Sequence, residues 1–279
     1  MDLTVAEFLE YLADDDGVKV IAAYIEDIKD SGAFLRALKR ITPRKPVIIL
    51  KGGVTGEGAE AAASHTGAMA GDHSIWSAVM RQHRCIEVHT EREMVDVVML
   101  ATSKRLPAGP RVGYLGAGGG TSVLFTDLAA SAGFLIPELS EKTQTSIGET
   151  IPDVNTSTRN PVDLGAAGFD YNITTHAMRE LDRDENIDFM IIYLSLDFLN
   201  LFDRKRLEEG LHAIGAEAQG LAKPVIPVLA KAADHKPRLE EIRLLALSLL
   251  RDAGLSMYGD LEDAVAAVRA VLPWSLSRG

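Results

Sequence analysis

The chain of 279 residues has little cysteine and no long hydrophobic run. Its one thiol, Cys85, excludes an internal disulfide and a zinc site of paired cysteines, and it fits a reducing cytosol. No stretch of about 18 apolar residues is present, so we expect no transmembrane helix. The polar, acidic start MDLTVAEFLE differs from a secretory signal. We therefore expect a cytoplasmic protein.

Positive charge is also scarce. Lysine and arginine total 29 residues against 40 aspartates and glutamates, which gives a formal net charge of −11. Such a surface repels phosphate backbones and anionic membranes, so we expect neither nucleic acid nor a membrane as a partner. Hydrophobic residues make up 47% and charged residues 25%, the usual balance of a globular protein rather than a disordered or fibrous one.

Short apolar runs alternate with amphipathic segments along the chain. The apolar runs are nearly continuous, which is typical of strands covered on both faces in a parallel sheet. The alternation therefore predicts an α/β fold with parallel sheets and right-handed crossovers. The expected strands are 18–26, 46–51, 85–88, 111–116, 133–137, 187–194, 224–229 and 255–258.

Two prolines and a glycine in the segment 106–110 interrupt both patterns and predict a domain boundary. We expect domains at 1–106 and 107–279. The first opens on a helix with no preceding strand, so we expect it to be truncated at its N-terminus; the alternative is a domain that another chain completes. The segment KPVIILK at 45–51 recurs as KPVIPVLA at 223–230, which predicts two related units. The alternative is convergence of two generic strand–helix units.

Glycine and alanine dominate the segment 52–71, which predicts a loop that can approach a ligand or move. His65 is its one strongly functional side chain and lies between Ser64 and Thr66. From composition alone, His65 is either a catalytic group or an ordinary surface histidine.

Glu26 follows the apolar run 20–25, at the expected carboxyl end of a strand. Ligands of open α/β sheets bind at these ends, where a carboxylate can orient an imidazole and stabilise its positive charge. The alternative is a plain acid at a helix N-terminus, because Asp27 and Asp30 are close by.

A glycine-rich turn at 116–122 joins the expected strand 111–116 to a helix. Glycine leaves the backbone N–H groups free, and together with the positive end of the helix they favour an anion such as phosphate. A dinucleotide fingerprint would need a third glycine where Thr121 stands, although Glu138 partly restores an NAD-type interpretation. The expected phosphate-binding residues are Gly116, Gly118, Gly119, Gly120, Thr121 and Ser122.

The segment Asn160-Pro-Val-Asp-Leu164 carries two short polar side chains, Asn160 and Asp163, which line a cleft or cap a structural turn. The histidines that follow His65 in this half of the chain have no metal-binding helical spacing, so we expect no metal site. These histidines are His73, His83 and His89.

Ser64-His-Thr-Gly-Ala-Met-Ala-Gly71, preceded by KPVIILKGG at 45–53, resembles the phosphohistidine segment of the ADP-forming (NDP-forming) acyl-CoA synthetases, relatives of succinyl-CoA synthetase. The strand–GAGGG–helix unit, PELS at 137–140 and NPVDL at 160–164 follow in the order of that family. The resemblance implies two flavodoxin-like, succinyl-CoA ligase-like domains. It also implies an acid–thiol ligase that exchanges an acyl group between CoA and phosphate and carries the phosphoryl group to ADP on a histidine.

By this resemblance His65 is the phosphoryl carrier, and Glu26 is the acid that hydrogen-bonds its imidazole. The turn at 116–122 matches a helix N-terminus that stabilises the phosphohistidine. The supporting residues are Ser64, Thr66, Gly67, Asn160 and Asp163.

The CoA-binding Rossmann domain and the ATP-grasp domain of that family have no counterpart in these 279 residues. We therefore expect ATP or ADP with Mg²⁺, and CoA, to be bound by missing domains or partner chains, and no cofactor by this chain itself. We expect a fragment or subunit of an oligomer that acts on a small-molecule acyl substrate and is inactive alone. The alternatives are a catalytically silent scaffold or regulatory subunit, and an NAD-type dinucleotide-binding protein.

Overall fold

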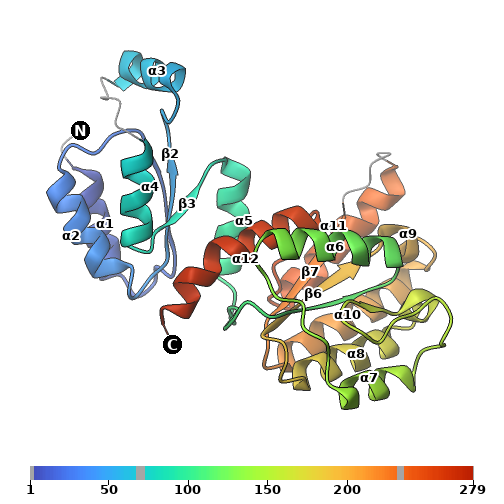
Figure 1. Cartoon of the computed structure of the whole chain (residues 1–279). Helices are drawn as coiled ribbons and strands as arrows, with labels where there is room; N and C mark the ends of the chain where they lie inside the picture. The colour runs from blue at the N-terminus through green and yellow to red at the C-terminus, as the bar shows by residue number, and fades with distance from the viewer. Residues whose placement is uncertain (1–2, 67–72, 231–235, 279) are drawn as a thin grey trace. The chain divides into compact units, whose positions relative to one another are not determined.

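The computed structural model describes residues 3–66, 73–230 and 236–278. The chain forms two compact units: unit 1 comprises Met1–Thr102 and Pro273–Gly279, and unit 2 comprises Ser103–Leu272. Each unit is an α/β domain built on a parallel sheet, so the predicted fold class is confirmed (Figure 1). Within the described part of the chain, no helix combines the length and the apolar character that a bilayer crossing requires.

Unit 1 is a three-stranded parallel sheet of order β1-β2-β3 with helices on both faces. Side chains alternate across a strand, so Val47 and Ile49 of β2 pack with α1, α2 and α4, while α5 covers the opposite face. In chain order the elements are α1 (Val5–Ala13), β1 (Ile21–Ile25), α2 (Ser31–Ile41), β2 (Val47–Lys51), α3 (Gly56–Thr66), α4 (His73–Gln82), β3 (Ile86–Val88) and α5 (Glu91–Ala101).

The terminal residues Pro273–Gly279 belong to unit 1. Trp274, in α12 (Leu261–Leu276), is 2% exposed and donates its indole N–H to the Thr42 carbonyl at 2.8 Å. Thr42 is the C-cap of α2, so the bond satisfies one of the carbonyl groups that every helix leaves free at its C-terminus. A buried indole also needs a partner for its N–H, and the contact serves both groups.

Unit 2 is a four-stranded parallel sheet of order β5-β4-β6-β7. Its strands β4, β6 and β7 are buried almost along their whole length, as strands covered on both faces must be. The elements are β4 (Val112–Gly116), α6 (Gly119–Ser131), α7 (Glu141–Gly148), β5 (Val162–Asp163), a 3₁₀ turn (Gly165–Phe169), α8 (Tyr171–Arg183), β6 (Phe189–Leu194), α9 (Leu196–Leu199), α10 (Arg204–Gly220), β7 (Val225–Leu229), α11 (Pro237–Asp252) and α12.

Two of the expected strands are reduced to single bridging pairs. In the segment 133–137 only Leu135 pairs, with Arg111, and in 255–258 only Tyr258 pairs, with Val228. Pro137 cannot donate to a ladder, and its carbonyl accepts from the Asn160 side chain instead of a strand. The apolar runs therefore located segments at the edges of the sheet, but they overstated the pairing.

Candidate functional site

Glu26 lies at the carboxyl end of β1 and is held on two sides. Its Oε1 atom accepts a hydrogen bond from the Tyr24 hydroxyl at 3.1 Å, and its backbone carbonyl accepts one from Lys51 Nζ at 2.7 Å. The side chain is half-buried. The structure thus places Glu26 at the sheet end that the sequence predicted, and not at the start of α2, whose cap is Asp30.

Lys51 ends β2 beside Glu26 and was not singled out by the sequence analysis. Its ammonium group also donates to the Gly52 carbonyl and lies 5.8 Å from the centre of the Trp76 ring. Partial burial lowers the pKa of Lys51 below its ordinary value, although the charges of Asp27 and Glu26 oppose this shift. Lys51 therefore brings a positive charge to the carboxyl ends of β1 and β2.

The prediction of a loop around His65 is wrong for residues 56–66, because these residues form helix α3. Alanine has the highest helix propensity, and Thr55 caps the first turn by accepting from the Gly58 N–H at 3.0 Å. These two features outweigh the low helix propensity of the glycines in this segment. The backbone of His65 lies near the end of α3.

The side chains of His65 and Thr66, and the whole of Gly67, lie outside the described residues. Ser64 is exposed. The pairing of His65 with Glu26 therefore stays a prediction.

In unit 2 the glycine-rich turn joins β4 to α6 as predicted. Gly118 precedes α6 at φ +125°, a conformation that favours glycine. The hydroxyl groups of Thr121 and Ser122 both donate to the Gly118 carbonyl, at 2.8 and 3.4 Å. The next N–H groups, those of Gly119, Gly120 and Thr121, have no partner among the described residues, as is usual in a first helical turn. Three donors at the positive end of α6 are thus free for an anion.

Asp163 lies directly under this turn, at the end of β5. Its Oδ1 atom accepts from the N–H groups of Gly118 and Gly165, at 2.8 and 2.9 Å. Asp163 is 9% exposed, so its carboxylate lies against the turn rather than in water. Gly118 consequently has no N–H left for a ligand, although its backbone shapes the turn.

Asn160, by contrast, is built into the sheet. Its amide donates to the carbonyls of Val112 and Pro137 at 2.8 and 3.0 Å, and its Oδ1 accepts from the Tyr114 N–H at 3.1 Å. All three of these hydrogen bonds are made with backbone groups, so Asn160 holds its own segment beside β4. Of the two predicted supporting residues in this segment, only Asp163 reaches the turn.

Tyr114 lies beneath the turn and was missed by the sequence analysis. It is fully buried and stacks on Phe125 with ring centres 4.5 Å apart. Its hydroxyl forms no well-shaped hydrogen bond among the described residues, and burial raises its pKa above the ordinary value. A Cβ at position 116 would lie 2.7 Å from this hydroxyl, so Gly116 is required by the packing of Tyr114.

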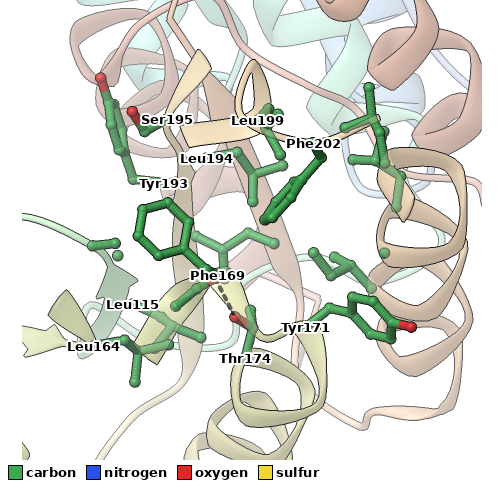
Figure 2. A pocket seen from close by; sticks show the side chains of 18 of the residues that line it. Leu115, Leu164, Phe169, Tyr171, Thr174, Tyr193, Leu194, Ser195, Leu199 and Phe202 are labelled. Carbon is green, nitrogen blue, oxygen red and sulfur yellow. Dashed lines mark hydrogen bonds between the residues drawn. The ribbon is translucent and has the colours of Figure 1, made fainter. Parts of the chain in front are cut away.

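A cavity of about 60 Å³ lies beside the turn in unit 2 (Figure 2). Leu115 and Leu164 form the side next to the turn, and Phe169 and Phe202 meet edge to face at 6.1 Å across it. The Arg206 guanidinium lies 4.9 Å from the centre of the Phe202 ring. The walls are mainly apolar, and Arg206 is the one charged residue among the described residues that line them, so the cavity suits a small apolar group.

No group of three or more histidine, cysteine, aspartate or glutamate side chains within residues 3–66, 73–230 and 236–278 is arranged to hold a metal ion.

The chain is similar to known proteins in both sequence and structure. Residues 1–101 match the succinyl-CoA ligase like flavodoxin domain. Over 275 residues the chain is 34% identical to the acetate–CoA ligase [ADP-forming] II subunit alpha of Pyrococcus furiosus, a match that spans 97% of this chain and 57% of that protein. The chain is a relative of the ADP-forming acyl-CoA ligases.

Two further ligases support the relationship. The 4-hydroxybutyrate–CoA ligase [ADP-forming] of Nitrosopumilus maritimus is 36% identical over 58% of this chain and 24% of its own length. The dinucleotide forming acetyl-coenzyme A synthetase 1 of Ca. Korarchaeum cryptofilum, solved with phosphate and ADP, superposes with a TM-score of 0.81 at 25% identity, over 99% of this chain and 57% of that one. The chain thus spans a little over half the length of the Pyrococcus subunit and of the Korarchaeum synthetase. The family predicted from the SHTGAMAG segment and its neighbours is confirmed.

Proposed function

We propose that this chain is the phosphoryl-transfer part of an NDP-forming acyl-CoA synthetase, with His65 as the carrier. The observation that carries the proposal is the first turn of α6, where three unpaired N–H groups lie beside a small apolar cavity. The site can hold a phosphoryl group and, next to it, the apolar part of an acyl group. The predicted domains 1–106 and 107–279 then correspond to a histidine-bearing half and a phosphate-binding half.

In the proposed reaction a neutral imidazole nitrogen of His65 attacks the phosphorus of an acyl phosphate. The bond between phosphorus and the acyl oxygen breaks, and the carboxylate leaves with the electron pair. A terminal oxygen of a nucleoside diphosphate then attacks the phosphohistidine, and the P–N bond breaks to restore the histidine. Such transfers depend on positioning and charge stabilisation more than on covalent help from the protein.

Glu26 serves this chemistry as the partner of the second imidazole nitrogen. One carboxylate oxygen is occupied by Tyr24, and Oε2 has no partner among the described residues. A carboxylate there selects the tautomer and offsets the positive charge that forms when the other nitrogen bonds to phosphorus. The unpaired N–H groups of Gly119, Gly120 and Thr121 stabilise the charge on the phosphoryl oxygens.

The remaining functions fall to other modules. We propose that CoA is bound by a Rossmann domain and the nucleotide with Mg²⁺ by an ATP-grasp domain, in the same full-length protein or in a partner subunit. On this proposal the chain does not complete a catalytic cycle alone, and the acyl substrate is a small carboxylic acid.

A second candidate function is a catalytically silent scaffold, and one observation favours it. The Asp163 carboxylate already occupies the Gly118 N–H and brings a negative charge to the place where a phosphoryl group would bind. A turn stabilised in this way needs no ligand.

Mass spectrometry of the intact protein and its peptides under non-acidic conditions separates the two functions. The sample contains this chain, its cognate nucleotide-binding module, ATP and Mg²⁺. We expect an acid-labile phosphoryl group on His65 that is lost in His65→Ala. A label on another residue contradicts the proposed carrier, and no label in the presence of an active nucleotide module supports the scaffold.

A further inference from the structure

Tyr24 and Glu26 share one face at the end of β1, because residues two apart along a strand project to the same side. The phenolic hydroxyl of Tyr24 donates to Glu26 Oε1 at 3.1 Å. Tyr24 is nevertheless 61% exposed, so burial does not hold its side chain in place. A tyrosine at such a position is held mainly by its specific contacts.

Gly52 provides the second contact. It follows β2 and donates its N–H to the Ile25 carbonyl at 3.0 Å, which places its backbone next to the end of β1. A Cβ on this residue would lie 2.4 Å from the Tyr24 hydroxyl oxygen and 2.9 Å from the ring carbon that bears it. The ring of Tyr24 therefore lies across Gly52, in space that any other residue would fill.

Lys51 completes the arrangement from the backbone side. Its ammonium group donates to the Glu26 carbonyl at 2.7 Å and so fixes the main chain from which the carboxylate extends. Glu26 is thus anchored at its backbone by Lys51 and at one carboxylate oxygen by Tyr24.

We propose that Tyr24 is a positioning residue that holds the Glu26 carboxylate in one orientation, with Oε2 directed away from the tyrosine for the imidazole of His65. This inference rests on the proposed function. A free glutamate side chain samples several rotamers, and freezing them costs free energy at the moment of reaction. By fixing the acid in advance, Tyr24 would help to orient the imidazole that this acid binds. Groups that hydrogen-bond metal-bound histidines orient their rings in the same manner.

The first experiment measures the rate of His65 phosphorylation in the assembled enzyme, with its nucleotide-binding module, ATP and Mg²⁺. Tyr24→Phe removes only the hydroxyl, and we expect loading about tenfold slower, because a hydrogen bond to a charged group is lost. Tyr11→Phe is the matched control, since Tyr11 is 74% exposed and lies on α1, away from β1. It should load at the wild-type rate.

A double-mutant cycle tests whether Tyr24 acts through Glu26. We expect Glu26→Gln to slow loading, and Tyr24→Phe to add nothing further in the Glu26→Gln background. Gly52→Ala, which displaces the ring, should slow loading as much as Tyr24→Phe does. A full additional tenfold loss in the double variant would show that Tyr24 acts independently of Glu26 and would overturn the proposal.

A second measurement needs no reaction at all. The hydrogen bond to Glu26 raises the pKa of Tyr24 above its ordinary value, with smaller contributions from burial and from the charges of Glu26 and Glu91. The tyrosinate absorbance that Tyr24→Phe removes should therefore titrate at lower pH in Glu26→Gln, and only slightly lower in Glu91→Gln. An unchanged Tyr24 titration in Glu26→Gln would mean that the bond is absent.

The outcomes separate the two claims. Wild-type protein that takes no phosphoryl group refutes the proposed function, whatever the tyrosine titration gives. Wild-type protein that is phosphorylated, together with a Tyr24→Phe variant that loads at the same rate, refutes the positioning role alone.

Discussion

Lys45 and Lys223 make the same contact in the two units: each donates its ammonium group to backbone carbonyls at the C-terminal end of an earlier helix, α1 for Lys45 and α8 for Lys223. Each lysine begins a Lys-Pro-Val sequence, and the valine of that sequence is the first residue of β2 or β7. The negative end of a helix favours a cation, so the contact is stabilising in both places. The acceptors are Leu12 and Asp15 for Lys45, and Leu181, Asp182 and Asp184 for Lys223.

Replacing Lys45 should therefore weaken unit 1. Lys45 is only 7% exposed, and Lys45→Met would leave two partly buried carbonyls without a donor. We expect a loss of about 2 kcal/mol in the free energy of unfolding, measured with urea. Lys39→Met is the control, because Lys39 is exposed on α2, and it should change stability by less than about 0.5 kcal/mol. Equal stability of the two variants would show that the contact contributes nothing.

Substitutions of Asp163 should distinguish its hydrogen bonds from its charge. Asp163→Ala removes the acceptor for the N–H groups of Gly118 and Gly165, and we expect unit 2 to lose about 2 kcal/mol. Asp163→Asn keeps an oxygen in place and should lose clearly less. Because it also removes the negative charge under the turn, inorganic phosphate should bind to this variant more tightly than to the wild type, as calorimetry would show. Weaker phosphate binding would assign the anion to another place.

The two tryptophans of the chain offer a matched pair for the contact between Trp274 and Thr42. Trp274→Phe removes an indole donor whose partner is a helix-terminal carbonyl, so we expect about 1 to 2 kcal/mol of destabilisation. The indole N–H of Trp76 is buried with no partner among the described residues, so Trp76→Phe should cost less or even stabilise. Both residues belong to unit 1, and the remaining tryptophan reports unfolding by fluorescence in each variant.

Cys85 should make the stability of unit 1 depend on pH. Burial raises the pKa of its thiol from 9.0 to about 12, so the folded state keeps the proton after the unfolded state has lost it. Its contribution is fully present below pH 9 and is lost as the pH rises toward 12, with a slope of up to about 1.4 kcal/mol per pH unit. Cys85→Ala should show a shallower decline over this range in urea unfolding. Identical slopes would mean that the thiolate is accommodated in the fold.

Much of the fold could be predicted from the sequence because its signals are local. The apolar runs gave the parallel strands, and the glycines at 116–120 gave the turn before α6. The failures have physical causes. Alanine propensity and the Thr55 cap turned the expected loop around His65 into helix α3, and Pro137 limited pairing at Leu135.

The candidate site was only partly predictable, since its key contacts join residues far apart in sequence. Asp163 was expected either to line a cleft or to cap a turn, but its bond to the Gly118 N–H spans 45 positions and leaves no trace in composition. Tyr24 was missed although it stands two residues from Glu26. The alternation of a strand could have shown that the two share a face, but the space over Gly52 could not have been found without coordinates.

The strand orders of the two sheets have a consequence for where small molecules can enter. In unit 1 the order β1-β2-β3 runs in a single direction, whereas in unit 2 the chain goes from β4 outward to β5 and then crosses back to β6 on the other side. Connections that leave two neighbouring parallel strands toward opposite faces open a crevice between their carboxyl ends. That reversal falls between β4 and β6. Gly116 ends β4, Ser195 directly follows β6, and both border the cavity of Figure 2. The connectivity of unit 2 thus predicts a binding crevice at the same place where the side chains form the cavity.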